Sequence, residues 1–188
     1  MIETILLAFL FGKLRGYKLK PLFQTWHIYI ILSFELIYWF LQGSVFLGNY
    51  SFVKYAGMFK TVYLYSFFIL IFRHKLYYSA ISGSICIVIG SILNNIAISA
   101  NNGAMPVFPT LSYLTGYATV DSFSKVNDIH ILGNSATRMK LLTDFIDTGY
   151  SILSIGDIFI RLFAFIIIFN AIKHLNIPKE ESIIVYDA

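Results

Sequence analysis

The sequence predicts an all-α integral membrane protein, a bundle of about five transmembrane helices with an ordered extracellular lid between the last two. Of its 188 residues, 57% are hydrophobic and 13% are charged, whereas soluble domains carry about 25% charged residues. A hydrocarbon core of roughly 30 Å requires about 20 mostly apolar residues per helix. Three segments supply them: 22–42, 77–100 and 152–172. We therefore treat residues 1–188 as a single membrane domain.

Two further spans are predicted from shorter apolar runs. Residues 1–20 open with an acid and no base before the apolar run, which is unlike a cleavable signal peptide. This run reaches the length of a span only if it continues through the bases of residues 13–20, whose side chains would extend to the headgroups. Residues 55–72 are strongly apolar, and Lys60 near their outer start is interpreted as a boundary residue that extends to the membrane surface.

The basic residues predict the orientation. The loop "KLRGYKLK" (13–20) carries four bases and no acid, and "RHK" (73–75) carries two bases and a histidine. Short basic loops stay on the cytoplasmic side. The amino terminus and the lid, residues 101–151, are then outside, and the tail, residues 173–188, is cytoplasmic. Because the bases lie in short clusters beside apolar segments, the net charge of +4 indicates membrane topology rather than a nucleic-acid partner.

Several polar residues fall inside the predicted spans, at similar depth in the outer half. Asp157 and Arg161 are four residues apart and share a helical face, with the acid first, as the favourable order requires. A bare charge near the middle of a bilayer costs at least about 2.5–3.5 kcal/mol, so we expect these groups to face the bundle and pair. The expected polar cluster contains Glu35, Asn94, Asn95, Asp157 and Arg161. Four interpretations stay open: a structural ion-pair network, a site for a small molecule or ion, a catalytic site, and an interface with another membrane subunit.

The lid, residues 101–151, is too long for an idle connection, because unstructured links beyond about 15 residues are uncommon in compact proteins. It opens with the turn dipeptide Asn102-Gly103, and Pro106 biases the preceding residue toward an extended conformation. The last carbonyls of the fourth span need partners at the membrane surface, and the adjacent asparagines are suited to this. We expect the chain to fold back across the bundle mouth, with a short helix around Ala136–Asp147.

Three motifs in the second half of the chain are familiar: "ANNGAMPV" (100–107), "TRMKLLTD" (137–144) and "SIGDIFI" (154–160). In this order and spacing they resemble a family of small bacterial membrane proteins of unknown function, and the likeness covers most of the chain. The sequence departs from the family pattern at Thr143, which replaces a glycine, and at Asp147, which stands where a proline is expected. The resemblance implies a multi-pass protein of the bacterial cytoplasmic membrane and assigns no activity.

The resemblance also implies that the lid and the region around Asp157 act as one functional unit. The positions that match the family motifs are His130, Thr137, Arg138, Asp144, Gly156 and Asp157. Together with the turn at the start of the lid, they give the expected lid site: Asn101, Asn102, Gly103, Met105, Pro106, His130, Thr137, Arg138 and Asp144.

No motif of a common catalytic class is present. The sequence contains no phosphate-binding loop, G-x-S-x-G elbow, H-E-x-x-H or Cys/His metal spacing, so we predict no cofactor, metal or catalytic residue and lean against an enzyme. A remote alternative is a membrane-embedded cysteine peptidase using His74 and Cys86. Cys86, however, lies about 13 Å along the helix from Tyr77, near mid-membrane, where a thiolate is poorly stabilised. It belongs instead to a helix-packing stripe of small residues: Ser79, Gly83, Cys86 and Gly90.

The sequence therefore predicts a membrane protein with an outward-facing polar cluster under a lid, which binds, senses or helps to transport a small ligand at the outer face. The alternative is an accessory or assembly subunit whose lid docks a membrane-protein partner. A chain of about five helices without internal repeats has little room for the paired halves of many secondary transporters. Both hypotheses have the lipid bilayer as a partner, and neither involves nucleic acid.

Overall fold

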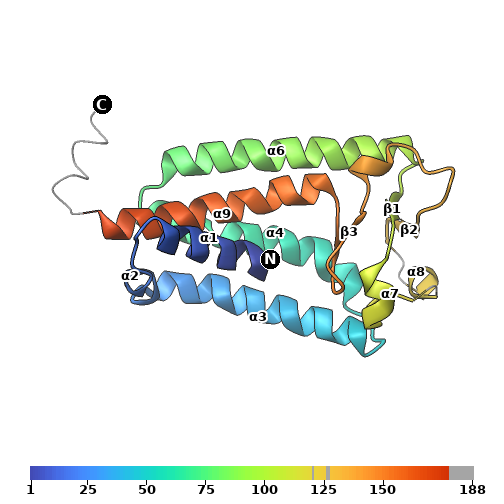
Figure 1. Ribbon diagram of the computed structural model, residues 1–188, viewed down its shortest axis with the longest axis horizontal. Coiled ribbons are helices and arrows are strands. Elements are labelled where there is room, and N and C mark those ends of the chain that lie inside the picture. The colour runs from blue at the N-terminus through green and yellow to red at the C-terminus, as the bar shows by residue number, and fades with distance from the viewer. Residues whose placement is uncertain (120, 126–127, 178–188) are drawn as a thin grey trace.

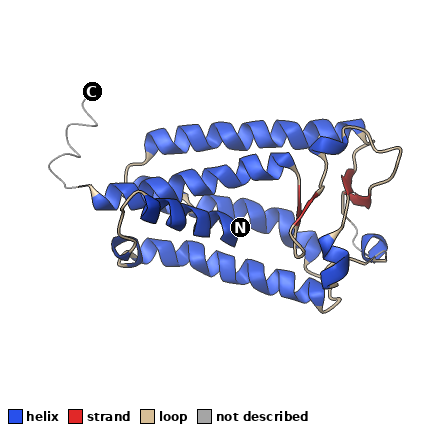
Figure 2. Cartoon of the chain, viewed as in Figure 1, coloured by secondary structure: helices blue, strands red, loops and turns tan. Residues whose placement is uncertain are grey.

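The computed structural model describes residues 1–119, 121–125 and 128–177, and it is a bundle of long helices with a folded lid at one end (Figure 1). The helices run along the long axis, and the described strands lie at the lid end (Figure 2); we call the opposite end the tail end. The bundle consists of α1 (Ile2–Leu14), α2 (Lys20–Phe23), α3 (Trp26–Phe46), a 3-10 turn (Val53–Tyr55), α4 (Ala56–Ser66), α5 (Phe68–Arg73), α6 (Tyr77–Ala100) and α9 (Ile155–Asn176).

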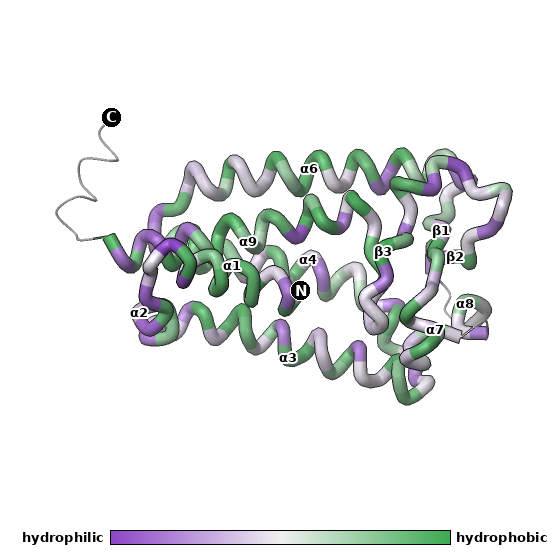
Figure 3. Tube along the Cα trace, in the orientation of Figure 1, coloured by the Kyte–Doolittle hydropathy of each residue, from purple (hydrophilic) through white to green (hydrophobic). Residues whose placement is uncertain are grey.

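Within the described residues, four helical segments are long and apolar enough to cross a membrane: Trp26–Phe46, Val53–Arg73, Tyr77–Ala100 and Ile155–Asn176. Hydrophobic residues are spread along all the long helices (Figure 3), and large side chains such as Leu36 and Tyr78 are 72% and 79% exposed. A surface of this kind is suited to lipid, because monomeric soluble proteins rarely expose large contiguous apolar patches. The predicted class, an all-α multi-pass membrane bundle, is confirmed.

The first helix differs from the predicted span over residues 1–20. α1 ends at Leu14, and Gly16 follows in the left-handed conformation. Its 13 residues rise only about 20 Å, because the apolar run is short and the bases that follow turn away at the tail end instead of extending the helix. Met1 is buried midway along the bundle (Figure 1). A full span would place the amino terminus at the lid end. In the structure it lies among the helices instead.

α6 and α9 pack along the predicted stripe of small residues. A Cβ atom built on Gly83 would lie 2.8 Å from Cδ2 of Phe163, and one built on Gly90 would overlap the carbonyl oxygen of Gly156 on α9. Small residues let helix backbones approach closely in lipid. The packing role is confirmed at Gly83 and Gly90, and it brings Asn94, one turn farther along α6, against the start of α9.

The apolar core surrounds the tail half of α9, where α1, α5 and α6 pack against it. Its buried side chains include Ile5, Ile28, Phe67, Leu70, Phe163, Ile167, Ile168 and Ile172. Buried apolar side chains need no hydrogen-bond partners, whereas polar groups inside a bundle need hydrogen-bond or ion-pair partners. The polar residues of the spans are therefore concentrated toward the lid end, where the side chains of the lid can meet them.

The lid consists of short elements: β1 (Met105–Val107), α7 (Leu111–Thr115), α8 (Ser122–Lys125), β2 (His130–Leu132), a 3-10 turn (Lys140–Leu142), β3 (Ile146–Asp147) and β4 (Ile152–Leu153). β1 pairs in parallel with β2, and β3 pairs antiparallel with β4. The expected helix around Ala136–Asp147 is wrong, since this stretch contains the 3-10 turn, bends and short extended segments, and no α-helix. Thr143 ends the turn by donating from Oγ1 to the carbonyl of Lys140 at 2.7 Å. The next backbone N–H then donates to the carbonyl of Pro106 at 3.1 Å.

Asn101 joins the end of α6 to the lid. Its Nδ2 donates to the carbonyls of Ala97 at 2.8 Å and Arg138 at 2.9 Å, and its Oδ1 accepts from the backbone N–H of Arg138 at 2.9 Å. Asn102 and Gly103 follow with φ angles of +58° and +86°. The predicted turn and the predicted asparagine partner for the last helical carbonyls are both confirmed.

Candidate functional site

A cavity of about 330 Å³ lies between the lid and the lid end of the bundle. Its wall combines ionisable groups of both signs with hydroxyl and apolar side chains from α3, α4, α6, α9 and the lid. Its polar side chains come from Tyr38, Lys60, Tyr63, Asn94, His130, Asp144, Ser151, Asp157 and Arg161. Most of these residues belong to three hydrogen-bonded or ion-paired groups.

The first group, the Asp157 cluster, consists of Lys60, Asn94, Ser154 and Asp157. Nζ of Lys60 donates to Oδ1 of Asp157 at 2.7 Å, and Nδ2 of Asn94 approaches the same oxygen at 3.5 Å. Oγ of Ser154 accepts from the backbone N–H of Asp157 at 2.9 Å and donates to Oδ1 of Asn94 at 2.8 Å. Asp157 completes a capping box at the start of α9, a position where a carboxylate is stabilised by the helix dipole.

The contacts of Lys60 differ from those predicted for the span over residues 55–72. The sequence favours a boundary role for Lys60 and a pair between Asp157 and Arg161, but the ion-pair partner of Asp157 is Lys60. The reason is that α4 brings its lysine against the first turn of α9, and a sequence pattern does not show which helices are neighbours. Asn94 lies in the cluster, whereas Asn95 is exposed and lies outside it.

The second group, the Glu35 cluster, consists of Met1, Glu3, Glu35, Tyr63 and Arg161. Nη1 of Arg161 donates to Oε2 of Glu3 at 3.2 Å. The amino group of Met1 lies 3.4 Å from a carboxylate oxygen of Glu3 and 3.4 Å from one of Glu35. The hydroxyl of Tyr63 donates to Oε2 of Glu35 at 2.8 Å, and Glu35 is 3% exposed. Glu35 and Arg161 are thus linked through Glu3 and Met1, and the single network expected with Asp157 is divided into two clusters.

The third group, the lid triad, consists of Asp128, His130 and Asp144. Nδ1 of His130 lies 2.7 Å from Oδ2 of Asp128, and its Nε2 lies 3.5 Å from Oδ2 of Asp144. Asp144 is 4% exposed, and its Oδ1 has no hydrogen-bond partner among the residues that the structure describes. A buried polar atom left unpaired costs roughly 1–3 kcal/mol. A donor placed in the cavity beside Asp144 would remove this cost.

The surroundings of the lid triad shift its proton affinities. Burial raises the pKa of the Asp144 carboxyl to about 7, and the negative charge of Asp157 adds to the rise. Burial lowers the pKa of His130, but the hydrogen bond and the charge of Asp128 outweigh burial, and the net shift of that pKa is upward. The lid triad can therefore take up or release a proton close to neutral pH.

The remaining predicted lid residues mostly hold the lid together. Met105 is buried and lines the cavity. Arg138 is exposed and is held through its backbone by Asn101, and Oγ1 of Thr137 accepts from the backbone N–H of Asn134 at 3.0 Å. The structure thus places Arg138 and Thr137 in a turn of the lid, away from the wall of the cavity.

Sequence reasoning missed Glu3, Lys60 and Asp128 as members of the site. Glu3 is the one acid of the first apolar run, and Lys60 is the one base between positions 56 and 72. An isolated charge inside an apolar run was an available signal. Asp128 gave no comparable signal, because two-residue spacing does not show that its carboxylate meets His130. Among the described residues, no group of three or more His, Cys, Asp or Glu side chains could hold a metal ion.

Comparison with known proteins yields a family without an assigned activity. A family model described as "Family of unknown function (DUF5317)" matches residues 19–169. No curated protein and no solved structure matches the chain. The matched stretch contains the Asp157 cluster and the lid triad, whereas Met1 and Glu3 lie outside it. The motif-based resemblance to a membrane family of unknown function is confirmed at the level of the family.

Proposed function

The chain belongs to that family of unknown function, and we propose that it binds the polar part of a small molecule in the cavity under its lid, as a sensor or transport-related protein. One observation carries the proposal: a cavity of about 330 Å³, lined by Lys60, His130, Asp157 and Arg161, contains a buried Asp144 oxygen without a described partner. Ligand sites typically occupy about 300–1,000 Å³ and place a few polar groups in a largely apolar wall.

The polar groups of the cavity suit a ligand that has both donors and acceptors. The side chain of Lys60 is 48% exposed, so its ammonium can contact an anionic or carbonyl oxygen while it stays near Asp157. Asp144 and His130 can each donate or accept, depending on protonation. Ligand binding would then be coupled to the uptake or release of a proton, because the charge of the ligand changes which protonation state of Asp144 and His130 is favoured.

Orientation is part of the proposal. The basic loops at residues 13–20 and 73–75 lie at the tail end (Figure 1), and short basic loops face the cytoplasm. The lid and its cavity would then face the exterior of a bacterial cytoplasmic membrane. Cysteine-accessibility labelling on intact cells tests this, because a cysteine introduced at Ser135 in the lid should react with a membrane-impermeant maleimide, and one at Lys75 should not.

A thermal-stability screen of the detergent-purified protein tests the binding function. The probes are water-soluble amino acids, sugars, nucleosides and phosphate esters, each added alone. A compound at 100 times its Kd stabilises by about 2.7 kcal/mol. We expect the shift of a hit to be lost in Asp144→Asn, which keeps the shape of the side chain, and to persist in Arg138→Ala, whose side chain lies outside the cavity. Equal shifts in wild type and Asp144→Asn would contradict the proposal.

A second candidate function, an accessory subunit that docks a membrane partner, is favoured by the apolar surface of the lid. Its exposed apolar residues include Leu111, Leu114, Ile131, Met139 and Leu141. This function predicts a stoichiometric partner after mild solubilisation, lost in Leu141→Glu and retained in Ser135→Glu, at an exposed polar position of the lid. A clean monomer or homodimer from native membranes would count against it.

A further inference from the structure

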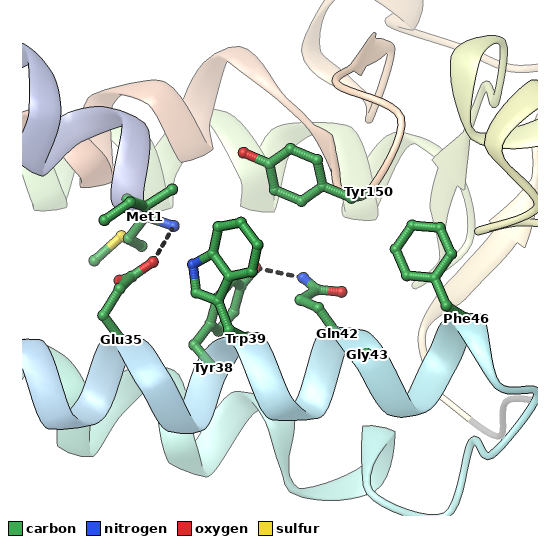
Figure 4. Close-up of a pocket in the computed structure, with 9 residues that line it drawn as sticks. Met1, Glu35, Tyr38, Trp39, Gln42, Gly43, Phe46 and Tyr150 are labelled. Carbon is green, nitrogen blue, oxygen red and sulfur yellow. Dashed lines mark hydrogen bonds and ion pairs between the residues drawn. The ribbon is translucent and has the colours of Figure 1, made fainter.

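A second cavity, of about 350 Å³, lies along the lid half of α3. Figure 4 shows Trp39 of α3 and Tyr150 of the lid extending toward each other across it, with Met1 and Glu35 at one end and Phe46 at the other. The ring centroids of Trp39 and Tyr150 are 6.2 Å apart. The helix rises about 16 Å between Glu35 and Phe46. We call this elongated cavity the groove.

α1 does not cover the groove. α1 begins at Ile2, beside Glu35, and runs toward the tail end, so it leaves the lid half of α3 uncovered (Figure 1). Gly43 widens the space, since a Cβ atom built there would have no atom within 4 Å. Next to it on α3, Trp39 is 54% exposed, and Phe40 is also exposed. The groove therefore adjoins the face of α3 that meets the hydrocarbon of the bilayer.

The groove adjoins the polar cavity under the lid. Tyr38 and Met1 line both spaces. On the inner side of the groove, Nε2 of Gln42 donates to the hydroxyl of Tyr38 at 2.7 Å, and the hydroxyl of Tyr117 donates to Oε1 of Gln42 at 2.6 Å. The two adjoining spaces thus offer an aromatic wall beside the lipid and ionisable groups beneath the lid.

We propose that the two spaces form one site for a membrane lipid of the leaflet at the lid end, with an acyl chain in the groove and a zwitterionic head in the polar cavity. This inference rests on the proposed binding function and specifies its ligand. An apolar space that adjoins the bilayer excludes water and is in contact with lipid chains at high concentration. The charges select the head: the ammonium of Lys60 suits a phosphate, and the carboxyl of Asp144 suits an ammonium group.

The arrangement explains why the groove ends at charged residues. A chain that lies in the groove beside Trp39 reaches the boundary formed by Tyr38, where the wall changes from aromatic to ionisable. A molecule with a chain and a head can satisfy both parts of the wall, whereas a purely polar compound leaves the groove unfilled. Lipid binding should therefore depend on residues of the groove and of the cavity together.

Binding of two probes to the purified full-length protein tests the inference. The probes are palmitoyl-lysophosphatidylethanolamine and glycerophosphoethanolamine, which is the same head without its chain, and binding is read by native mass spectrometry and thermal stability. Gly43→Leu fills the groove, and Gly43→Ala is a smaller step in the same direction. Ser91→Leu is the matched control, because Ser91 is exposed on α6 and lines neither space.

We expect the lysolipid to bind wild type and Ser91→Leu equally, and at least tenfold more weakly to Gly43→Leu, with Gly43→Ala between them. Asp144→Asn should weaken lysolipid binding as well. Equal lysolipid binding to wild type and Gly43→Leu would overturn the inference, and so would an equal loss of binding in Ser91→Leu. Full lysolipid binding to Asp144→Asn would also overturn it. A switch from dimer to monomer in Gly43→Leu would do the same. If a polar compound binds in a manner sensitive to Asp144→Asn and insensitive to Gly43→Leu, the binding function stands and the lipid inference fails.

Discussion

The two ends of the bundle hold their polar side chains in different ways. At the tail end, the ring of His74 packs against the rings of His27 and His174 at centroid distances of 6.2 and 5.5 Å. Burial and the neighbouring histidines lower the pKa of His74 to about 4, so this residue is neutral at pH 7. At the lid end, charged residues pair with one another around a cavity. The buried histidines of the tail end therefore act as packing groups, whereas the polar residues of the lid end keep their charge, at a cost that the proposed binding role would explain.

The two ends also respond to pH in opposite directions. The folded-state pKa of Asp144 is raised from 3.8 to about 7, so the stability it contributes is fully present below about pH 3.8 and is lost as the pH rises through about 7. His130, whose pKa is also raised, loses its contribution in the same direction. The pKa of His74 is lowered instead. Its contribution is present above about pH 6.5 and is lost as the pH falls toward 4.

The largest effect is expected for Arg161→Met at the lid end. This change removes a mostly buried cation from the Glu35 cluster and leaves the carboxylate of Glu3 without its guanidinium partner. Breaking one partner of a buried ion pair typically costs about 3–5 kcal/mol. Reversible unfolding in mixed micelles measures the loss. A cost no larger than that of His74→Phe at the tail end would remove the contrast between the two ends.

A smaller effect is expected from pH on the lid. Because Asp144 and His130 lose their stabilising contributions with rising pH, backbone amides of residues 104–108 and 143–147 should exchange hydrogen at least about tenfold faster at pH 8 than at pH 5, after correction for intrinsic rates. Hydrogen exchange read by mass spectrometry measures this. Asp144→Asn should abolish most of the difference, and a lid protected equally at both pH values would be the contrary result.

His74→Phe should change stability at pH 7 by less than about 1 kcal/mol, because Nε2 of His74 has no described partner and replacement of a buried unpaired polar atom by an apolar group is nearly neutral. The variant should also lose the decline in melting temperature that wild type shows between pH 6.5 and 4.5. A marked loss of stability at pH 7 would mean that His74 has a partner that the apolar ring cannot replace.

The smallest effect on stability is expected for Lys60→Gln. The side chain of Lys60 is half exposed, and Asp157 keeps its contacts with Ser154 and Asn94. Exposed ion pairs contribute about 0–1 kcal/mol. Binding of any ligand with an anionic group should nevertheless weaken, which a titration followed by thermal stability detects. A collapse of stability would assign Lys60 a structural role in place of a binding one.

The four long apolar helices could be predicted from the sequence because hydropathy depends only on local composition, whereas the first predicted span, residues 1–20, could not. The start of α9 was equally accessible, since Asp157 follows a serine at the spacing of a capping box. The seam between α6 and α9 followed from the spacing of Gly83 and Gly90. Each of these features is encoded within about one helix.

The pairing of charges could not be predicted, because it depends on which helices are neighbours. Lys60 meets Asp157 only because α4 lies beside the start of α9, and Glu3 meets Arg161 only because α1 packs against α9. The predicted lid helix was wrong for a related reason. The stretch around Thr143 has no strong helix or strand signal, and its extended form is set by pairing with β1. The groove beside Trp39 is likewise left uncovered by α1.

The most direct test is an experimental density map of the protein purified from native membranes in a mild detergent. We expect density for a non-protein molecule in the cavity between Lys60 and Asp144, with a polar atom within hydrogen-bond distance of Oδ1 of Asp144. A map in which this oxygen is paired with a protein donor and the cavity is closed would contradict a binding site under the lid.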